Sequence, residues 1–287
     1  MLLGVSASRR IWGNCETAVK SVLLSARRSG AQTAFIRLTD IPIEPCRGCF
    51  RCLAEGGTCP GEDGLYDLLC HIRSVDTLVL AAPVYFMAPP AKLIALLDRL
   101  LVAAGLKKTM SQDRQAVTIT IMGNRRWRGI AEPFVNMVVS LLGFRIVDSL
   151  SLVAEGPGEI IMEPAIASRL EEIGRALARS GDIETPEGRA DVCPVCRSDF
   201  FTIEPPSIVC PVCGLRGDLE TYTRENRFVE TGGELRWGTD WLHGHIDAWV
   251  RPSVARYRAN RKRILKNLHR FREQYAVEEE RGKADVQ

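Results

Sequence analysis

The chain has 287 residues, of which 46% are hydrophobic and 25% are charged, and its net charge is +3. This charge is unevenly distributed, because residues 251–287 carry 11 Lys/Arg against 5 Asp/Glu and the rest of the chain is therefore mildly acidic. This balance indicates one large globular domain with an additional module, and it excludes a disordered chain, a collagen-like repeat and a disulfide miniprotein. Because no apolar run approaches about 18 residues and the start is not leader-like, we expect a cytoplasmic protein without a membrane helix.

Short runs rich in Val, Ile, Leu and Thr alternate with helical patterns through residues 1–180. We predict buried parallel strands at Met1–Val5, Thr33–Ile36, Thr77–Ala82, Ala116–Met122 and Phe144–Leu152. We predict helices at Asn14–Arg28, Asp63–Arg73, Pro90–Ala104, Ile130–Leu142 and Glu163–Ser180. This alternation predicts a doubly wound five-stranded parallel α/β sheet, in which ligands bind at the carboxyl ends of the strands.

The loop after the first strand is rich in hydroxyls and arginines, and it ends in a Gly-Asn pair where a helix begins. Backbone N–H groups and the dipole at a helix N-terminus attract a phosphate, so we predict a phosphate-monoester site here. The loop is neither a dinucleotide fingerprint nor a Walker loop. A plain polar turn, with Asn14 capping the helix, is the alternative.

Two further loops leave the same predicted edge. Pro83, Val84, Tyr85 and Phe86 follow the third strand and form a rigid, apolar wall suited to an aromatic ring, although the two aromatic residues could instead pack in the core. Gly123 and Asn124 form a turn after the fourth strand. A phosphate loop, an aromatic wall and a Gly-Asn turn at one edge together describe a flavin mononucleotide site.

The chain resembles the iron–sulfur flavoprotein branch of the NADPH-dependent FMN reductase and flavodoxin-like superfamily. The resemblance lies in these segments, in a cysteine run at 46–59, and in the pairs Ala91-Lys92 and Asp98-Arg99. The resemblance implies a flavodoxin-like fold, FMN and a homo-oligomer, either a dimer or a tetramer. It implies that the isoalloxazine lies against Pro83–Phe86 and that the phosphate binds at Ser6, Ser8, Arg10, Asn14, Cys15 and Thr17. Cys15 departs from the Ser or Thr usual in the family.

Eight of the ten cysteines fall into two groups, and the first is Cys46, Cys49, Cys52 and Cys59. Three cysteines at steps of three and a fourth soon after allow one loop to supply all four thiolates of a cubane, so we predict a [4Fe-4S] cluster. Zinc, or no metal, is the alternative. Of the other two cysteines, Cys70 lies in an apolar helical stretch and is predicted to be buried.

The second group is Cys193, Cys196, Cys210 and Cys213, two Cys-Pro-Val-Cys knuckles that predict a ribbon with tetrahedral sulfur ligation. Structural zinc is favoured, and mononuclear iron or no metal is the alternative. Acidic side chains around the knuckles disfavour nucleic acid as a partner. We divide the chain into a flavodoxin-like domain at 1–188, a ribbon at 189–222, and a Trp-rich segment with a basic helix at 223–287.

The basic C-terminal helix is predicted over Ser253–Tyr275 and carries an apolar stripe that includes Tyr257, Ile264, Leu268 and Phe271. The stripe packs on the body or on a second subunit, or the basic face docks an acidic electron carrier. His243 and His245 precede it and are expected to pack beside tryptophans; metal ligation is the alternative.

The sequence predicts an FMN-dependent oxidoreductase that passes electrons between FMN and the cluster, with ferredoxin or NAD(P)H as the electron-transfer partner. No Ser/His/Asp arrangement is found in the sequence, so we expect the cofactors to supply the chemistry and name no catalytic side chain. The alternative is a redox-sensing or partner-binding protein, in which the cluster and the ribbon are regulatory or structural.

Overall fold

The computed structural model describes residues 1–53, 58–102, 114–179 and 190–233, and beyond them residues 244, 247–248, 251–253, 255–266 and 269. The chain divides into two units, Met1–Leu242 and His243–Gln287, and each is described by itself. The first unit contains the sheet, both groups of cysteines and the loops predicted to bind FMN.

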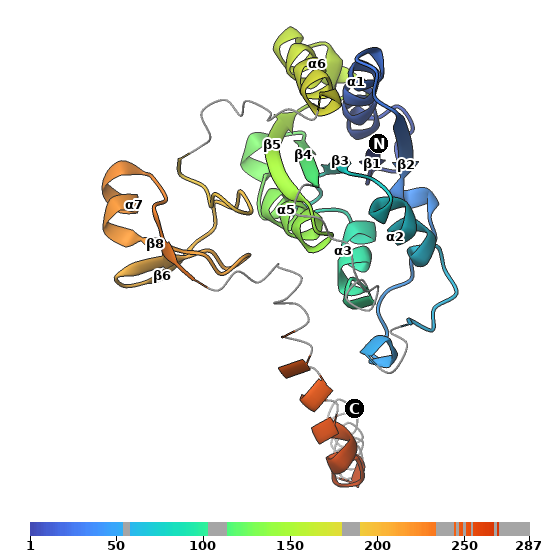
Figure 1. The fold of residues 1–287 in the computed structure, drawn as a ribbon, viewed down its shortest axis with the longest axis vertical. Coiled ribbons are helices and arrows are strands. Elements are labelled where there is room, and N and C mark those ends of the chain that lie inside the picture. Colours follow the sequence, from blue (N-terminus) through green and yellow to red (C-terminus); the bar gives the residue numbers. More distant parts are fainter. Residues whose placement is uncertain are drawn as a thin grey trace, which may run out of the picture. The chain divides into compact units, whose positions relative to one another are not determined.

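Five parallel strands form the main sheet in the order β2-β1-β3-β4-β5, with β1 between β2 and β3 (Figure 1). The apolar runs of the three central strands are buried on both faces, as predicted, whereas the edge strands are largely half-buried. The sheet confirms the predicted doubly wound, flavodoxin-like fold. The strands are β1 (Leu2–Ser6), β2 (Thr33–Arg37), β3 (Thr77–Pro83), β4 (Gln115–Met122) and β5 (Arg145–Val153).

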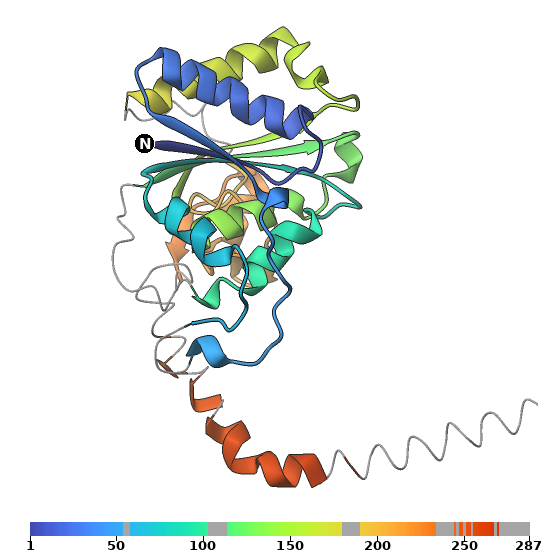
Figure 2. The ribbon, with the colours of Figure 1, turned by 90° about the vertical axis from the view of Figure 1, so that its right-hand side faces the viewer.

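Helices cover both faces of the sheet, α1 and α6 on one and α2, α3 and α5 on the other (Figure 2). Each face has its own apolar core, and the periodicity of the helices supplies the side chains that fill it. The helices are α1 (Asn14–Arg28), α2 (Leu65–Arg73), α3 (Ala91–Asp98), α5 (Ala131–Leu141) and α6 (Pro164–Ala178). The 3₁₀ turns are η1 (Leu38–Asp40), η2 (Arg51–Leu53), η3 (Arg125–Trp127) and η4 (Glu159–Ile161).

Two glycines allow α1 to approach its neighbours closely. A Cβ atom on Gly4 of β1 would lie 2.4 Å from Cγ1 of Val19, and a Cβ atom on Gly174 of α6 would lie 2.4 Å from the carbonyl oxygen of Val22. Any side chain at either position would push α1 away from the sheet or away from α6. Helix α1, whose start is the predicted phosphate site, therefore lies close to both β1 and α6.

The structure differs from the sequence-based elements near α2 and α3. Helix α2 begins at Leu65 rather than at Asp63, because the Asp63 carboxylate accepts the N–H of Leu65 at 3.2 Å and pairs with Arg99. Helix α3 ends at Asp98, and part of its predicted continuation lies outside the described residues. The prediction that Cys70 is buried is wrong, since the core face of α2 passes through Leu68, Leu69 and Ile72 and leaves Cys70 exposed.

A four-stranded antiparallel sheet carries the second group of cysteines and has a separate core. Phe228 stacks on Phe201 with ring centroids 5.1 Å apart, so the ribbon recruits residues beyond its expected end at 222. The reason is that β9 pairs with β8 and closes the core. The elements are β6 (Thr202–Glu204), β7 (Ser207–Val209), β8 (Arg216–Asp218), α7 (Leu219–Glu225) and β9 (Glu230–Gly232).

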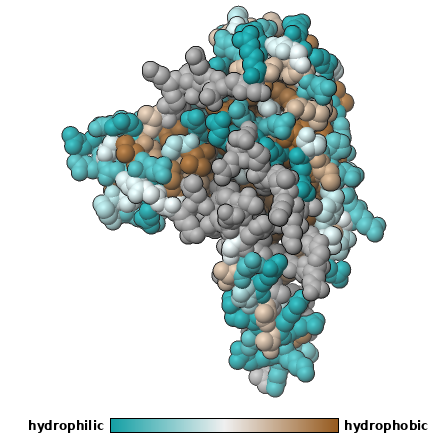
Figure 3. All heavy atoms as spheres, viewed as in Figure 1, coloured by the Kyte–Doolittle hydropathy of each residue, from teal (hydrophilic) through white to brown (hydrophobic). Residues whose placement is uncertain are grey.

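The second unit is helical at 251–253 and 255–266, and the face of these residues that Figure 3 shows is mostly hydrophilic. Tyr257 and Ile264 of the predicted apolar stripe are exposed within this chain, at 50% and 38%. Leu268, Phe271 and Tyr275 lie outside the described residues, as do His243 and His245. Within the ranges that the structure describes, no helix is both long and apolar enough to cross a membrane.

Candidate functional site

The loop between β1 and α1 is braced by its own hydroxyl groups. The Ser6 hydroxyl accepts the N–H of Ser8 at 3.4 Å, and the Ser8 hydroxyl accepts the N–H of Arg10 at 3.2 Å. Both serines are buried, whereas the Arg9 and Arg10 side chains are exposed. Helix α1 begins directly after the loop, and its first N–H groups have no acceptor inside the helix. This arrangement suits an anion at the end of β1.

Two further residues predicted to bind phosphate have side chains that hold the loop, and the thiol of a third is buried. The Asn14 amide donates to the carbonyl of Gly156 at 2.8 Å, which ties α1 to the loop after β5, and Gly13 rather than Asn14 caps the helix. The Thr17 hydroxyl donates to the carbonyl of Trp12 at 3.3 Å. Burial raises the pKa of the Cys15 thiol to about 12, which keeps this thiol protonated.

A buried carboxylate under this loop was not predicted from the sequence. Glu16 is fully buried and pairs with Lys20 at 2.6 Å and with Arg37 of β2 at 2.6 Å. Burial opposes ionisation of Glu16, but these two partners outweigh it and hold its pKa below the usual range. The Lys20 ammonium also lies 3.7 Å from the ring centre of Trp12, a residue in the left-handed region at φ 54°. The four-residue spacing of Glu16 and Lys20 on α1 is the one feature of the sequence that could have indicated this ion pair.

The loop after β3 forms a tight turn that presents aromatic side chains to solvent. Tyr85 and Ala88 exchange both backbone hydrogen bonds, at 2.9 and 3.0 Å, while Phe86 and Met87 adopt positive φ values of 47° and 65°. Phe86 is 85% exposed, so its ring does not pack in the core of this chain, and its contact with a ligand stays a prediction. Pro83 is buried at the end of β3, where it anchors the turn.

The loop after β4 meets this turn. The Asn124 side chain caps η3 by accepting the N–H of Arg126 at 2.9 Å, and the exposed Trp127 packs edge-on against Phe86 with centroids 6.1 Å apart. Gly129 permits the approach, because a Cβ atom there would lie 2.2 Å from Cβ of Met87. The two loops therefore share an open aromatic surface, to which Trp127 is an addition that the sequence did not single out.

The first group of cysteines follows η1 and lies on a loop that only partly contacts the domain. Cys46 and Cys49 are exposed, whereas Cys52 and Cys59 are half-buried against the core. Burial raises the pKa of the Cys52 thiol, and the charges of Cys59, Cys46 and Cys49 raise it further, so the four thiols lie within electrostatic reach. Residues 54–57 of this loop are outside the described ranges.

The four thiols of this loop are a donor set that suits an iron–sulfur cluster or a single ion, and the two differ in the sulfur spacing they need. The sulfur ligands of one tetrahedral ion lie roughly 3.8 Å apart, given a metal–sulfur distance of about 2.3 Å, whereas the ligands of a cubane bind different irons and are held further apart. In the described part of the chain, only the ribbon brings four such ligand atoms within 4.8 Å of one another. The Arg99 guanidinium, which donates to Cys59 Sγ at 3.2 Å, favours an anionic group at the loop.

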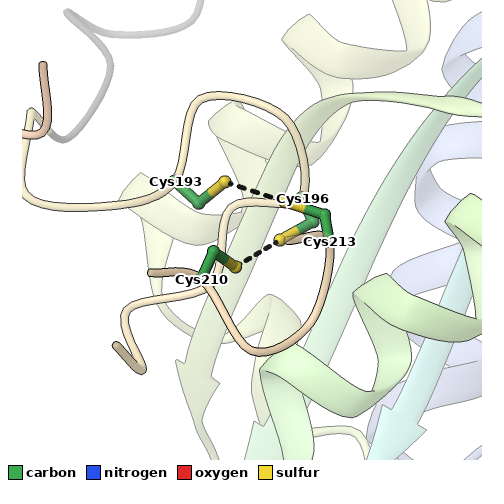
Figure 4. A group of neighbouring side chains, drawn as sticks. All are labelled: Cys193, Cys196, Cys210 and Cys213. Atoms are coloured by element: carbon green, nitrogen blue, oxygen red, sulfur yellow. Dashed lines mark hydrogen bonds between the residues drawn. The ribbon is translucent and has the colours of Figure 1, made fainter. Parts of the chain in front are cut away.

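The second group of cysteines forms a closed, buried site (Figure 4). Their sulfur atoms point toward one another, with Sγ–Sγ distances of 3.4 Å for Cys193–Cys213 and for Cys196–Cys210. This spacing fits a single tetrahedral ion such as zinc or iron. Hydrogen bonds with the other three thiols raise the pKa of the Cys196 thiol, and the largest contribution comes from Cys193. A metal ion that binds here must displace the proton of this thiol.

The backbone of the two knuckles follows one pattern. The N–H of Cys193 donates to Ser198 and the N–H of Cys210 donates to Leu215, each at 2.8 Å. Arg197 and Gly214 stand at the equivalent left-handed position, with φ values of 57° and 83°. Arginine in the first knuckle therefore takes the backbone conformation that glycine takes in the second.

An ion pair joins the first knuckle to the loop after β4. Arg128 directly follows η3 and donates to the Asp199 carboxylate, which lies three residues beyond Cys196. Arg128 also pairs with Glu132 of α5 at 3.0 Å, and Glu132 accepts hydrogen bonds from Ser149 and Ser151 of β5. Burial would lower the pKa of Arg128, but these carboxylates raise it overall.

Comparisons with known proteins agree with this geometry. The NADPH-dependent FMN reductase family matches residues 1–156. An iron–sulfur flavoprotein of Methanocaldococcus jannaschii is 37% identical over 34% of this chain and 50% of its own length, and one of Methanosarcina thermophila is 32% identical over 34% and 51%. The chain thus spans about half the length of the curated relatives it matches. A solved flavone reductase shares the fold, with a TM-score of 0.69 and 19% identity over 94% of this chain and 96% of its own.

The family match takes in β1 to β5 and the loops that follow β1, β2, β3 and β4. These loops carry the hydroxyl groups of Ser6 and Ser8, the first group of cysteines (46–59) and the aromatic turn described above. Because the match covers more than half of the chain, the chain belongs to the NADPH-dependent FMN reductase family, and the curated proteins it resembles are iron–sulfur flavoproteins.

Proposed function

We propose that the chain is an FMN-dependent oxidoreductase in which electrons pass between FMN and a [4Fe-4S] cluster held by Cys46, Cys49, Cys52 and Cys59. One observation carries the proposal. The strands are parallel and β2 lies beside β1, so the cysteine loop and the three FMN loops all leave the same edge of one sheet. FMN supplies two-electron exchange with an organic partner and one-electron exchange with an iron–sulfur centre.

The residues of the first loop bind the FMN phosphate in this proposal. Ser6 and Ser8 fix the backbone turn, the start of α1 supplies N–H donors, and the exposed Arg10 supplies positive charge. Asn14 and Thr17 act from beside the anion by holding the loop, as their hydrogen bonds favour. Cys15 contributes its backbone N–H rather than its buried thiol.

The aromatic turn holds the isoalloxazine ring. Pro83 and Val84 fix the turn, since the N–H of Val84 donates to the carbonyl of Ile121 at 2.8 Å. Tyr85 and Phe86 offer flat apolar surface that excludes water from one side of a ring. Gly123 and Asn124 begin the adjoining loop, where the lack of a side chain at Gly123 leaves room for a ring edge.

The ribbon holds one structural zinc ion through Cys193, Cys196, Cys210 and Cys213, and mononuclear iron remains the alternative occupant. Burial of all four thiols favours the structural assignment, because a redox iron requires a path for electrons to its ligands. The ribbon begins near residue 189, with the FMN domain before it at 1–188, and the Trp-rich segment with the basic helix runs to residue 287.

The assembly proposed for this function is a homo-oligomer. Several large apolar side chains at the carboxyl edge of the sheet are exposed in the single chain, beyond what one flavin would cover. They include Trp12, Met87, Trp127, Ile130 and Met162. A second copy of the chain would cover this surface. The electron donor is ferredoxin or NAD(P)H, and nucleic acid and membrane are not partners in this proposal.

A second candidate function is reduction of a flat aromatic enone by the flavin. The flavone reductase shares the fold of this chain almost end to end, and the open surface of Phe86 and Trp127 suits a planar molecule. With FMN, NAD(P)H and a flavone under argon, loss of the flavone absorbance would support this substrate class. Flavin reduction without flavone loss would leave electron transfer to the cluster as the function.

Stopped-flow reduction of bound FMN by reduced ferredoxin tests the main proposal, with the wild type compared with Cys49→Ser. We expect the variant to bind FMN, because its FMN loops are unchanged, but to lose reduction by the one-electron donor. The matched control is Cys70→Ser, an exposed cysteine outside both groups, which should react as the wild type does. Wild-type rates in Cys49→Ser would contradict the proposal and favour a redox-sensing or structural cluster.

A further inference from the structure

Arg99 and Asp63 form an ion pair beneath the first cysteine loop that is almost inaccessible to solvent. Their side chains are 2% and 3% exposed. The Asp63 carboxylate also accepts the N–H of Glu44 at 2.9 Å, and the Arg99 guanidinium donates to the carbonyl of Glu44 at 3.1 Å. The pair therefore joins both ends of the loop to the end of α3. Such a pair is kept ionised by its partners, since either charge left alone there would be costly.

The guanidinium has donors beyond those that Asp63 uses. Nη2 of Arg99 donates to Cys59 Sγ at 3.2 Å, and a Cβ atom on Gly61 would lie only 3.0 Å from the same nitrogen. Nε of Arg99 is buried and meets no acceptor among the residues that the structure describes. A fixed cation with spare N–H groups thus lies against a predicted ligand sulfur.

We propose that Arg99 sets the reduction potential of the [4Fe-4S] cluster through its hydrogen bond to Cys59, and that Asp63 moderates this effect by neutralising part of the guanidinium charge. The inference deepens the proposed function and rests on it, because it requires the cluster to be held by this loop. Arg99 acts through Cys59, so it is a positioning residue rather than a catalytic one.

The sign of the effect follows from charge. On reduction the cluster gains one electron from a one-electron donor, here dithionite, and no bond or proton changes at Arg99 or Cys59. The added negative charge spreads over the irons and their thiolate ligands, and an N–H donor to a ligand sulfur stabilises it. The interaction is strong because the pair is desolvated. Arg47 and Arg51 also lie in the loop, but both are exposed and are screened by water.

Three variants separate tuning from simple support of the loop. Arg99→Leu removes the cation and leaves the Asp63 carboxylate, so the midpoint potential should fall. Asp63→Asn keeps the side-chain shape and leaves Arg99 unneutralised, so the midpoint potential should rise. Arg99→Lys keeps the charge but loses the planar fork, so its potential should lie between those of Arg99→Leu and the wild type. Arg51→Leu is the matched control and should leave the potential unchanged.

The measurement is an anaerobic dithionite titration with redox mediators, followed by the EPR signal of the reduced cluster in the full chain. Iron content per chain is determined first, so that only loaded protein is compared. Opposite shifts in Arg99→Leu and Asp63→Asn support the proposal, because loss of a purely structural contact would not reverse sign. If Arg99→Leu fails to retain iron, Arg99→Lys and Asp63→Asn must still shift in opposite directions.

Shifts of the same sign, or no shift in Asp63→Asn, would overturn the inference while leaving the proposed function intact. A wild-type chain that binds FMN but holds no four-iron cluster would instead refute the proposed function itself. The two failures are distinguished by the iron analysis that precedes the titration.

Discussion

The two four-cysteine regions of this chain differ in how closely their own residues surround the sulfur atoms. In the ribbon, all four cysteines are buried, their sulfur atoms meet, and they are part of a separate apolar core. In the loop at 46–59, two cysteines are exposed, two are half-buried, and the supporting contacts come from Arg99 and Tyr66 of the flavodoxin-like domain.

The difference fits the size of the group proposed for each region. Four thiolates around one ion form a small tetrahedron, which a pair of knuckles can build from its own backbone hydrogen bonds. The proposed four-iron cluster is a larger body with a ligand on each iron, and its loop takes support from residues outside the loop. The ribbon site, which its own residues build, and the loop site, which the domain supports, should therefore respond differently to the same perturbation.

The largest expected effect is the loss of one metal without the other. Cys210→Ser should remove the ribbon zinc and leave about four irons per chain, and Cys49→Ser should do the reverse, because the two ligand sets share no residue. Metal analysis of anaerobically purified protein measures both. Loss of iron and zinc together from either variant would show that the two sites depend on each other.

The next largest effect is expected when the wild type is exposed to air, which should affect the metal content of the two sites differently. Cys46 and Cys49 are exposed, so oxygen can reach the cluster, whereas the four ribbon thiols are buried. We expect iron and its visible absorbance to be lost within the exposure time while zinc stays bound. The check is metal content before and after air exposure, with anaerobically held protein as the control. Zinc lost ahead of iron would mean that burial of the ribbon does not protect it.

A smaller effect is expected at Asp199, where the ribbon site contacts the domain. Asp199→Asn should weaken FMN binding about threefold, because Arg128 follows the loop predicted to hold the ring and loses one of two carboxylates in a partly exposed pair. Quenching of flavin fluorescence on titration with the apoprotein measures it. Glu204→Gln is the matched control, since Glu204 pairs with Arg216 inside the ribbon. Equal weakening in both variants would assign the effect to the ribbon itself.

The smallest expected effect concerns the two cysteines outside both groups. Cys15 has a pKa raised to about 12, so its thiolate appears only when the pH approaches that value, and at pH 8 it should resist iodoacetamide. Cys70 is exposed and should be alkylated under the same conditions. Mass spectrometry of tryptic peptides from folded and from denatured protein gives both occupancies. Rapid labelling of Cys15 in the folded chain would contradict its burial in α1.

Local patterns in the sequence predicted the parallel sheet and a candidate metal site at each of the two cysteine groups. The strand runs and helical periodicities depend on neighbours along the chain, and so do the cysteine spacings. The left-handed position at Arg197 and the aromatic turn at Phe86 lie within segments that the sequence had already singled out. The sequence therefore indicated where the candidate sites lie.

The tertiary structure alone decided which side chains support those sites. Glu16 meets Arg37 from β2, and Arg99 meets Asp63 and Cys59. Each contact joins residues far apart along the chain, and a charged side chain reads as solvent-exposed until packing buries it. Burial then makes a partner necessary, and only the arrangement of the whole sheet and its helices determines which partner is within reach.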